Sequence, residues 1–480
     1  MIILCLNCGS SSVKYRLYNW DERRTLAAGI VERIGIKDSF CEQEVAGKEH
    51  IRIPQDCQDH RQALQLAVST MTHPRYGVIK DMSCISAVGH RVVHGGEKFA
   101  KSVIITPEIY KTFEDLSDLA PLHNPPNLMG IKAAQEFMPD IPHMAIMDTA
   151  WHQTMPEHVY TYALPYEWYT KYGVRRYGFH GTSFLYVAKR AAVLLEKNPF
   201  ECNLVICHIG NGASVNAVKN GVSYDTSMGF TPLEGMMMGT RCGDHDTAID
   251  FFIMQKENKS PQEMNSILNK KSGLLGITGK TDMRDIQDAV DRNDDMASLA
   301  LEMECYRIKK YLGSYCFAVG GAHAIVFTAG IGEMSDIVRE KSLQGLESLG
   351  IVFDPEKNRI AKTRNSESEI SAKNSKVKIF VVPTDEERVL IEDVVHLLDG
   401  TYQIHTQFTY RFQDPEYMNT LRCLEFAEEC QKKPELLGIM PLIYKKAFLK
   451  EVKKQEGLKK RIQQIPDVQK YLPGIEKELN

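Results

Sequence analysis

One layout, in which a short turn rich in glycine and serine joins two apolar strands, occurs twice in the chain. Residues 2–20 contain it first, with the turn CGSSS, and residues 203–224 repeat it with the turn GNGAS. The second copy continues into Asn220-Gly221, a dipeptide typical of a tight hairpin turn. Two copies predict a duplicated β-rich module, so we expect a fold with two related halves.

Helical patterns lie between the strands. The stretches 108–119, 126–137 and 182–197 are expected to be helices, and AIVFTAGIGEMS (324–335) is expected to be a strand that leads into another helix. VKIFVVPTDEERVLIEDVVHLL (377–398) predicts a strand followed by a helix. Strands that alternate with helices in this way indicate the α/β class.

Composition excludes several kinds of protein. The 480 residues hold 58 Lys and Arg against 62 Asp and Glu, so the net charge of −4 offers no basic footprint for nucleic acid. The N-terminal MIILCLN lacks the basic segment of a signal peptide, and no apolar run approaches the roughly 18 residues that a membrane span needs. Twelve cysteines in a long chain suggest reduced thiols. We therefore expect a soluble, cytoplasmic protein.

Three small turns suggest a site for a polyphosphate. CGSSS, GNGAS and AGIGE each combine glycine with small neighbours, so backbone N–H groups can approach an anion closely. Lys14, two residues after the first turn, could place a cation on a phosphate. Many His, Arg and Asp residues stand beside other turns, in GHRVVHGG, APLHNPPN, MDTAWHQT, RRYGFHGTS and GTRCGDHD. This density of polar side chains beside glycine favours an active site over a core.

Two other patterns are interpreted as structural. GLLGITGKT (273–281) is similar to a phosphate-binding Walker loop, but five residues separate Gly273 from Gly279 where that motif has four. We expect it to be a loop. Cys5 and Cys8 form a C-x-x-C pair on a strand, whose alternation would point them to opposite faces. We therefore expect no zinc site or redox pair there.

The C-terminal part differs in composition. Residues 360–376 are polar and expected to form a surface loop, and residues 399–480 contain no further glycine-rich turn. Asp414-Pro415-Glu416 predicts a helix start. A second helix is expected after Pro441, with Tyr444, Phe448 and Val452 on one face. We interpret 399–480 as a helical extension that packs on the body of the protein or on a partner.

Taken together, the motifs resemble the acetate kinase family. LNCGSSSVKY, GHRVVHGG, HNPPNLMGI, DTAWHQTMP, RRYGFHGTS, CHIGNGAS, DTSMGFTPLEGMMMGTRCGDHD, GLLGITGKTDMRDI, FTAGIGE and VVPTDEE stand in that family's order over residues 1–398. The resemblance implies a duplicated, two-domain fold of the sugar kinase and actin-like superfamily with a nucleotide cleft. One domain would be 1–148, completed by about 380–398, and the other 149–379, with 399–480 as an extension of unknown role.

The resemblance also implies a reaction, the reversible transfer of a phosphoryl group from ATP to acetate, which gives acetyl phosphate and ADP. Such a transfer asks for alignment and for cations around the charge of the transition state. The implied catalytic residues are Arg91, Asp148, His180 and Arg241. Acetate is already ionised at neutral pH, so Asp148 is expected to position groups or to pair with an arginine, not to remove a proton.

Further residues are assigned by the resemblance alone. The acyl group would meet Arg91, Val93, Leu122, His123, Phe179 and Pro232. The nucleotide would meet Lys14, His208, Ile209, Gly210, Asn211, Gly212, Asp282, Met283, Arg284, Gly330, Ile331, Gly332, Glu333 and Met334. Asn7 and Glu386 would hold Mg²⁺, with Mn²⁺ as an alternative, directly or through water, because both offer the oxygen ligands of a hard cation. The family match implies a homodimer through the second domain.

Departures from the family pattern leave alternatives open. Met334 stands where the family has Asn, and Asp385 adds a carboxylate beside the expected metal ligand. The acceptor could be propionate or butyrate, since one methylene in an apolar pocket changes binding by only about 1–3 kcal/mol. The donor could be pyrophosphate in place of ATP. A nucleotide-binding, actin-like protein without turnover is the alternative from another class, and the four catalytic residues argue against it.

Overall fold

The computed structural model describes residues 1–45, 49–121 and 123–473, which form two compact units. Unit 1 contains Met1–Gln153 and Asp385–Tyr410, and unit 2 contains Thr154–Thr384 and the chain from Arg411 onward. The sequence led us to expect boundaries after 148, near 380 and after 398. Gln153 stays with unit 1, where its side-chain amide donates to the carbonyl oxygen of Gly96 over 3.2 Å.

Unit 1 is built on an eight-stranded sheet with the order β5-β4-β3-β2-β1-β6-β8-β7. Strands β1 to β5 pair antiparallel in succession, whereas β1, β6 and β8 run parallel. The strands are β1 (Ile2–Cys8), β2 (Ser12–Asn19), β3 (Arg24–Glu32), β4 (Phe40–Glu44), β5 (Ile51–Pro54), β6 (Ala87–Val92), β7 (Val103–Ile104) and β8 (His143–Met147).

Unit 2 is built on a six-stranded sheet with the order β11-β10-β9-β12-β14-β13. The hairpin strands pair antiparallel, and β9, β12 and β14 run parallel. The strands are β9 (Leu204–Ile209), β10 (Ala213–Lys219), β11 (Val222–Thr226), β12 (Ala324–Thr328), β13 (Ser368–Glu369) and β14 (Lys378–Val381).

The two sheets share one topology. In unit 1 the order β3-β2-β1-β6-β8 gives three antiparallel strands followed by two parallel ones, and β11-β10-β9-β12-β14 gives the same arrangement in unit 2. The repeated strand–turn–strand of the sequence is the β1–β2 and β9–β10 hairpin of each unit. The predicted duplicated α/β fold is therefore confirmed.

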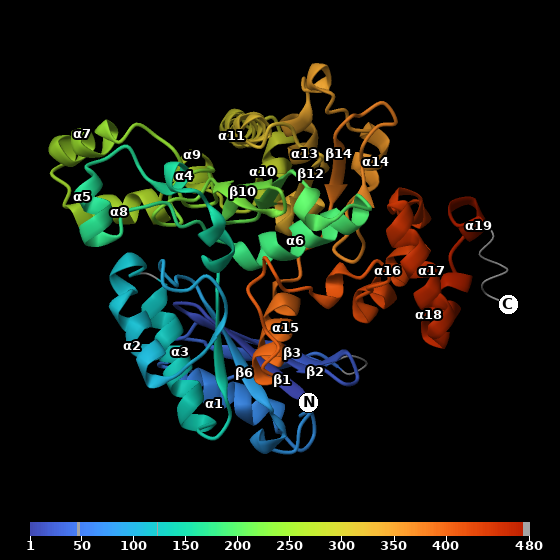
Figure 1. Cartoon of the computed structure of the whole chain (residues 1–480), viewed down its shortest axis with the longest axis horizontal. Helices are drawn as coiled ribbons and strands as arrows, with labels where there is room; N and C mark the ends of the chain where they lie inside the picture. Colours follow the sequence, from blue (N-terminus) through green and yellow to red (C-terminus); the bar gives the residue numbers. More distant parts are fainter. Residues whose placement is uncertain (46–48, 122, 474–480) are drawn as a thin grey trace. The chain divides into compact units, whose positions relative to one another are not determined.

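Helices cover both faces of the unit 1 sheet. Helices α1 (His60–Met71) and α3 (Asn124–Phe137) bury Ala63, Leu64, Ala133 and Ala134 against Leu4, Leu6 and Cys8 of β1. On the other face, α15 (Glu386–Leu398) packs Leu390, Ile391 and Val394 against Ile3 and Cys5 (Figure 1). Helix α2 (Pro107–Asp115) packs beside α3. Cys5 and Cys8 thus belong to opposite faces, as predicted.

In unit 2 the buried helix α6 packs on β9 and β12, and the long α11 packs on β9 and β10. The helices are α4 (Glu157–Tyr160), α5 (Tyr166–Tyr172), α6 (Gly181–Leu194), α7 (Ala248–Glu257), α8 (Pro261–Lys270), α9 (Gly273–Thr278), α10 (Met283–Val290), α11 (Asp295–Ala318), α12 (Ala329–Met334), α13 (Asp336–Leu343) and α14 (Pro355–Ile360). The expected loop at 273–281 is wrong, because Gly273 to Thr278 form α9. None of the helices in the described part of the chain has the length and apolar character that crossing a membrane requires.

The C-terminal residues add α16 (Thr420–Lys432), α17 (Leu442–Lys454), α18 (Glu456–Gln463) and α19 (Val468–Tyr471) to unit 2 (Figure 1). The predicted helix after Pro441 is confirmed as α17, with Tyr444, Phe448 and Val452 buried. The helix start predicted at Asp414 is wrong. Its carboxylate accepts from the backbone N–H of Glu416 in a turn, and Asn419 caps α16 instead.

The extension is divided between the units, since its residues up to Tyr410 belong to unit 1 and those from Arg411 onward belong to unit 2. Tyr402 and Tyr410 donate to the buried Asp393 of α15 over 3.2 and 2.9 Å. In unit 2, Arg190 donates to both carboxylate oxygens of Glu367 and to the carbonyl oxygen of Phe412. The expected surface loop 360–376 is wrong at this point, since Glu367 is only 5% exposed and pairs with a fully buried arginine.

Replacement of Gly89 by alanine should destabilise unit 1. A Cβ atom at Gly89 would lie 2.7 Å from Cγ2 of Val394 and 2.8 Å from Cδ2 of Leu390, so β6 approaches α15 only because this position is glycine. We expect Gly89→Ala to lower the free energy of unfolding by about 1–3 kcal/mol, as overpacking does. Urea unfolding followed by circular dichroism measures this.

Gly313→Ala is the matched control. Gly313 lies inside α11 and its added Cβ would meet nothing within 4 Å, so alanine should stabilise that helix by about 1 kcal/mol. Equal effects of the two substitutions would contradict the close packing of α15 on β6.

Candidate active site

A buried ion pair lies at the end of two parallel strands in unit 1. Arg91 belongs to β6, and Asp148, which is 2% exposed, follows β8 directly. Nε of Arg91 donates to Oδ1 of Asp148 over 2.9 Å and Nη2 donates to Oδ2 over 2.7 Å. Burial alone would lower the pKa of Arg91, but the carboxylates of Asp148 and Glu386 outweigh it and raise that pKa. The guanidinium is therefore charged and held in one orientation.

The expected metal ligand Glu386 belongs to the same group. It is the first residue of α15, and its Oε2 lies 3.8 Å from Nη2 of Arg91. Asp385 caps the helix and accepts from the backbone N–H of Arg388. Asn7 of β1 is paired in register with Lys14 of β2, and residues directly opposite one another on antiparallel strands point to one face. The structure thus brings Asn7 and Lys14 together.

Two asparagines of the HNPPN motif hold the loop that carries Val93. Asn127 accepts from the backbone N–H of Val93 over 3.0 Å and donates to the carbonyl oxygen of Cys8 over 2.7 Å. Asn124 accepts from the N–H of His94 and donates to its carbonyl oxygen. His123 stands just before α3. Leu122, the other acyl-pocket candidate of this unit, lies outside the described residues.

In unit 2 two predicted histidines stack on one another. The rings of His180 and His208 lie 4.1 Å apart at an angle of 17°. Nδ1 of His180 lies 2.8 Å from Oγ of Ser214, and Nδ1 of His208 lies 2.8 Å from Oγ of Ser183. His180 has a φ of 58°, a conformation that few residues other than glycine adopt, and this strain at the start of α6 is typical of a functional residue.

Arg241 and His180 border the same glycine. A Cβ atom at Gly212 would lie 3.8 Å from Nη1 of Arg241 and 3.8 Å from both Cε1 and Nε2 of His180. Nη1 of Arg241 donates to the carbonyl oxygen of Pro232 over 3.1 Å, and burial lowers the pKa of the guanidinium. Arg241 and His180, both predicted to be catalytic, thus lie beside the turn after β9. Phe179, which precedes His180, is buried.

The nucleotide candidates of unit 2 form one neighbourhood. His208 of β9 pairs in register with Thr328 of β12, so the turn at Gly210 and the start of α12 meet at one edge of the sheet. Asn211 lies against Gly239, whose added Cβ would also be 3.3 Å from the carbonyl oxygen of Thr281. The next residues, Asp282 to Arg284, begin α10. The residues Gly330, Ile331, Gly332, Glu333 and Met334 form α12.

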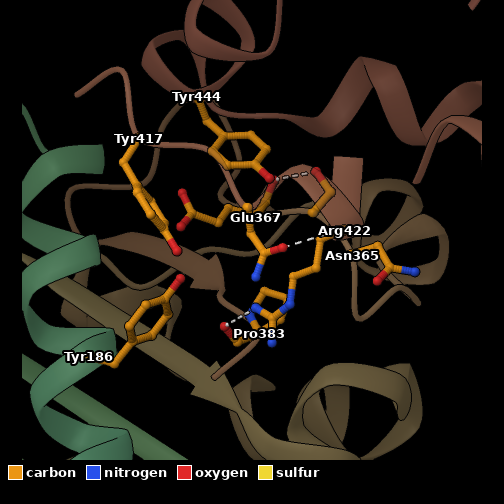
Figure 2. A pocket seen from close by; sticks show the side chains of 9 residues that line it. Tyr186, Asn365, Glu367, Pro383, Tyr417, Arg422 and Tyr444 are labelled. Atoms are coloured by element: carbon orange, nitrogen blue, oxygen red, sulfur yellow. Dashed lines mark hydrogen bonds between the residues drawn. The ribbon is translucent and has the colours of Figure 1, made fainter. Parts of the chain in front are cut away.

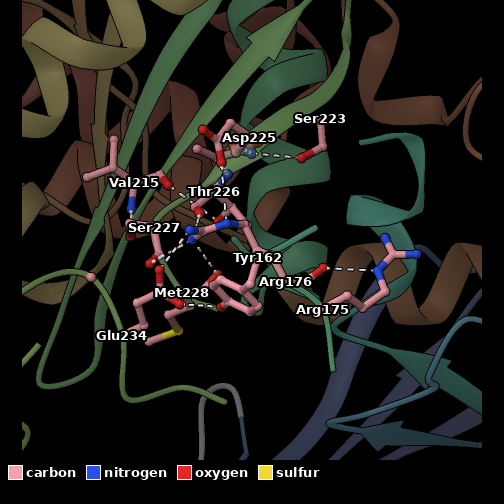
Figure 3. Close-up of polar contacts among 12 residues, drawn as sticks. Tyr162, Arg175, Arg176, Val215, Ser223, Asp225, Thr226, Ser227, Met228 and Glu234 are labelled. Atoms are coloured by element: carbon pink, nitrogen blue, oxygen red, sulfur yellow. Dashed lines mark hydrogen bonds and ion pairs between the residues drawn. The ribbon is translucent and has the colours of Figure 1, made fainter. Parts of the chain in front are cut away.

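One residue outside the predicted site organises the loop before Arg241. Arg176 donates to the carbonyl oxygens of Thr226, Ser227 and Met228 and, over 2.7 Å, to Glu234 (Figure 3). Tyr162 donates to the other oxygen of Glu234. These contacts fix both ends of the 226–234 loop, which contains Pro232. The double arginine of RRYGFHGTS, beside His180, was the signal that could have identified Arg176.

No cluster of three or more His, Cys, Asp or Glu side chains suited to a metal ion occurs among the described residues. A magnesium ion that works on nucleotides usually has one or two carboxylates together with phosphate oxygens and water. Glu386 and Asn7 supply oxygen donors of that kind, and Glu386 is 27% exposed, so its carboxylate is accessible to solvent. The donor set of unit 1 therefore fits magnesium bound mainly through a nucleotide.

The two sheets of one topology define the duplicated actin-like fold. Unit 1 pairs Arg91 with Asp148 at its strand ends, and unit 2 places Arg241 and His180 beside the glycine turn after β9. This is the fold class of the sugar kinase and actin superfamily. Within it, the chain belongs to the acetokinase family, whose sequence model matches residues 2–392.

Relatives are similar over most of their length. An acetate kinase of Treponema pallidum is 55% identical over 443 residues, which are 92% of this chain and 99% of that protein. An acetate kinase of Geobacter sulfurreducens is 57% identical over 419 residues, 87% of this chain and all of the relative. The crystal structure of an acetate kinase from Porphyromonas gingivalis is 46% identical with a TM-score of 0.79, and covers 83% of this chain and 99% of its own.

A solved structure with another acceptor in its name is also similar. The propionate kinase of Francisella tularensis is 39% identical with a TM-score of 0.77, over 82% of this chain and 99% of that chain. The two solved structures are thus both similar to this fold, while their names give different short carboxylates.

Proposed function

We propose that the protein is an acetate kinase, which transfers the γ-phosphoryl group of ATP to acetate in one reversible, in-line step and yields acetyl phosphate and ADP. The observation that carries the proposal is the meeting of Arg241 and His180 at Gly212, within the turn expected to line the nucleotide. Cations and donors arranged around a phosphate turn are what phosphoryl transfer needs. The acetate kinases among the relatives, at 55% and 57% identity, support the acceptor.

Arg91 is assigned to the acetate carboxylate. A guanidinium binds a carboxylate well when its planar donors are held in a fixed direction. Asp148 provides that by engaging Nε and Nη2 of Arg91 with its two oxygens. Because acetate has no proton to lose at neutral pH, Asp148 acts in this proposal by positioning Arg91 and not as a base.

The bond changes are then simple. A carboxylate oxygen of acetate forms the new bond to the γ-phosphorus while the bond from that phosphorus to the β–γ bridging oxygen breaks, and the electron pair leaves with ADP. Negative charge on the transferred group is stabilised by Arg241, and His180 donates a hydrogen bond to it. Contact with Ser214 through Nδ1 orients the ring of His180. In this proposal Nε2 would then donate to the phosphoryl group.

Magnesium is part of the proposal, with Asn7 and Glu386 as its protein ligands. The ion would neutralise charge on the β- and γ-phosphates. Lys14 lies opposite Asn7 on the next strand, where its ammonium group can bind the same phosphates. Residues His208 to Gly212, Asp282 to Arg284 and Gly330 to Met334 would hold the rest of the nucleotide.

A cytoplasmic location is also proposed. All twelve cysteines lie in the described part of the chain, and none forms a disulfide. Unpaired thiols on this scale are usual where the compartment is reducing.

A hydroxamate assay tests the function. Purified protein with Mg²⁺ is given acetate, propionate or butyrate, each with ATP or with pyrophosphate, and the acyl phosphate is trapped by hydroxylamine. We expect the highest kcat/KM with acetate and ATP. Activity only with pyrophosphate would mean that pyrophosphate, and not ATP, is the phosphoryl donor. No activity in any combination would favour a non-catalytic actin-like protein.

Loss of Arg241 should act on turnover. We expect Arg241→Ala to lower kcat about 10²- to 10³-fold, because its contact with the phosphoryl charge strengthens in the transition state. The affinity for ATP, measured by calorimetry, should change little. Arg359→Ala, at an exposed arginine paired with Glu356 elsewhere in unit 2, is the matched control. Near-normal turnover of Arg241→Ala would remove this arginine from the catalytic group.

Propionate kinase activity is the second candidate, favoured by the 39% identical propionate kinase structure. The proposed acyl contacts are the four residues that the resemblance assigned, Val93, Leu122, Phe179 and Pro232. Val93→Ala should make room for one methylene and shift the acetate-to-propionate ratio of kcat/KM roughly tenfold toward propionate. An unchanged ratio in the same assay would mean that the methyl group of acetate lies elsewhere.

A homodimer through unit 2 is proposed as well. Helix α7 exposes three large apolar side chains, Ile249, Phe251 and Phe252, at 52%, 73% and 56%. Such neighbouring apolar side chains mark an interaction surface. Sedimentation velocity at micromolar concentration should give a dimer, and Phe251→Ser with Phe252→Ser should give monomers. Phe317→Ser, at an equally exposed phenylalanine of α11, should leave the dimer intact. A wild-type monomer would contradict the proposal.

A further inference from the structure

We propose that Arg422, in the C-terminal extension, is a positioning residue for the nucleotide side of the active site. It holds the backbone of Pro383 and Thr384, from which contacts lead to His208 and to Glu333 of α12. The inference rests on the proposed function in that both of these residues are assigned to the nucleotide. It gives a role to residues 399–480, which the sequence resemblance left as an extension of unknown role.

The contact itself is a two-pronged one. Nη1 of Arg422 donates to the carbonyl oxygen of Pro383 over 3.2 Å (Figure 2). Nη2 donates to the carbonyl oxygen of Thr384 over 2.6 Å. The planar guanidinium of Arg422 thus forms a fork that binds the carbonyl oxygens of two consecutive residues. A lysine could not reproduce this geometry, because its ammonium group is a single point charge.

From Thr384 the contacts continue in two directions. Its hydroxyl donates to Oγ of Ser183 over 2.8 Å, and Oγ of Ser183 lies 2.8 Å from Nδ1 of His208. Its backbone N–H donates to Oε1 of Glu333 over 3.2 Å, and the same oxygen accepts from the N–H of Ala329, where α12 begins. The backbone that Arg422 holds therefore orients both turns expected to line the nucleotide.

Arg422 does not stabilise the helix that contains it, α16. It lies in the first turn of α16, after the cap Asn419, where the partial positive charge of a helix N-terminus disfavours a cation. A helix alone would be better served there by an acidic side chain. The carbonyl oxygens of Pro383 and Thr384 compensate for this position. Burial raises the pKa of Glu333, and the N–H of Thr384 and the charge of Arg422 offset part of that rise.

Helix α16 is itself firmly seated on unit 2. Oε2 and Oε1 of Glu429 accept from Thr363 and Asn365 over 2.5 and 2.9 Å. On the inner face of α16, Cys423, Phe426, Ala427 and Cys430 are buried. A rigid support of this kind lets one side chain fix the backbone of another segment.

The space around Arg422 is too small for a ligand. Side chains of Tyr186, Glu367, Tyr417 and Tyr444 line a cavity of about 20 Å³ beside it, and the hydroxyl groups of Tyr186 and Tyr417 point toward one another (Figure 2). That volume holds about one water molecule. The contacts of Arg422 with the backbone, and not a bound small molecule, therefore account for its place.

The test compares Arg422→Gln with Arg461→Gln. Arg461 is also in the extension, but its ion pair with Glu428 stays within the extension. For Arg422→Gln we expect the KM for ATP, and its dissociation constant by calorimetry, to rise about tenfold. The KM for acetate should stay within twofold. Arg461→Gln should match the wild type in all three quantities.

A merely structural role gives a different result. A variant that only loses folded protein has a lower apparent kcat with both KM values unchanged, and that outcome would overturn the inference. Thermal melts of each variant measure the folded fraction. If Arg422→Gln does not fold, Arg422→Lys is tested by the same criterion. We expect its dissociation constant for ATP to lie between the wild-type value and the tenfold increase expected when both hydrogen bonds are lost.

The two proposals fail separately. A wild-type protein that binds ATP but transfers nothing to any carboxylate overturns the proposed function, while the ratio of ATP dissociation constants still decides the role of Arg422. A wild-type protein that does not bind ATP overturns both.

Discussion

Each sheet of this protein contains parallel strands, and a parallel sheet has to be covered on both faces by helices. In unit 1 the second face is covered by α15, which follows the last parallel strand of unit 2 along the chain. Gly89 permits this close packing. Burial of the sheet is thus what brings Asp385 and Glu386, at the start of α15, to the strand ends that carry Arg91 and Asp148. The packing of α15 on the sheet therefore places Glu386 beside Arg91 and Asp148.

The two arginines of the proposed mechanism, Arg91 and Arg241, differ in their electrostatic surroundings. Arg91 is buried but compensated by two carboxylates, so it remains charged and fixed. Arg241 has carbonyl and sulfur partners, from Pro232 and Met238, and burial lowers its pKa. Among the described residues, the partners of the Arg241 guanidinium are a carbonyl oxygen and a sulfur atom, so its charge gains most from an incoming phosphoryl group. The contrast fits Arg91 as the holder of a small carboxylate and Arg241 as the group that meets transition-state charge.

Local pattern predicted a large part of this molecule. The strand–turn–strand repeat, the opposite faces of Cys5 and Cys8, and the helix with Tyr444, Phe448 and Val452 all follow from periodicity, which acts over a few residues. The failures have longer-range causes. Gly273 to Thr278 form a helix where a loop was expected, and its N–H groups at Leu274 and Leu275 donate to the carbonyl oxygens of Met238 and Gly239. Glu367 is buried because Arg190 and the extension cover it. Motif resemblance selected the candidate residues, but it gave no reason to select Arg176 or Arg422, whose role lies in contacts with distant carbonyl oxygens.

The extension shows most clearly the difference between what motif resemblance predicts and what contacts between distant residues add. The family model ends at residue 392, and relatives that cover 83% of this chain leave most of the extension unmatched, whereas the Treponema pallidum relative covers 92%. A family can add such a segment without changing its chemistry if the segment only supports backbone that already exists. Tyr402 and Tyr410 do so by bonding Asp393 within α15, and Arg422 does so at Pro383 and Thr384. The extension therefore holds the chain on both sides of Glu386, the residue that the proposed mechanism assigns to the metal.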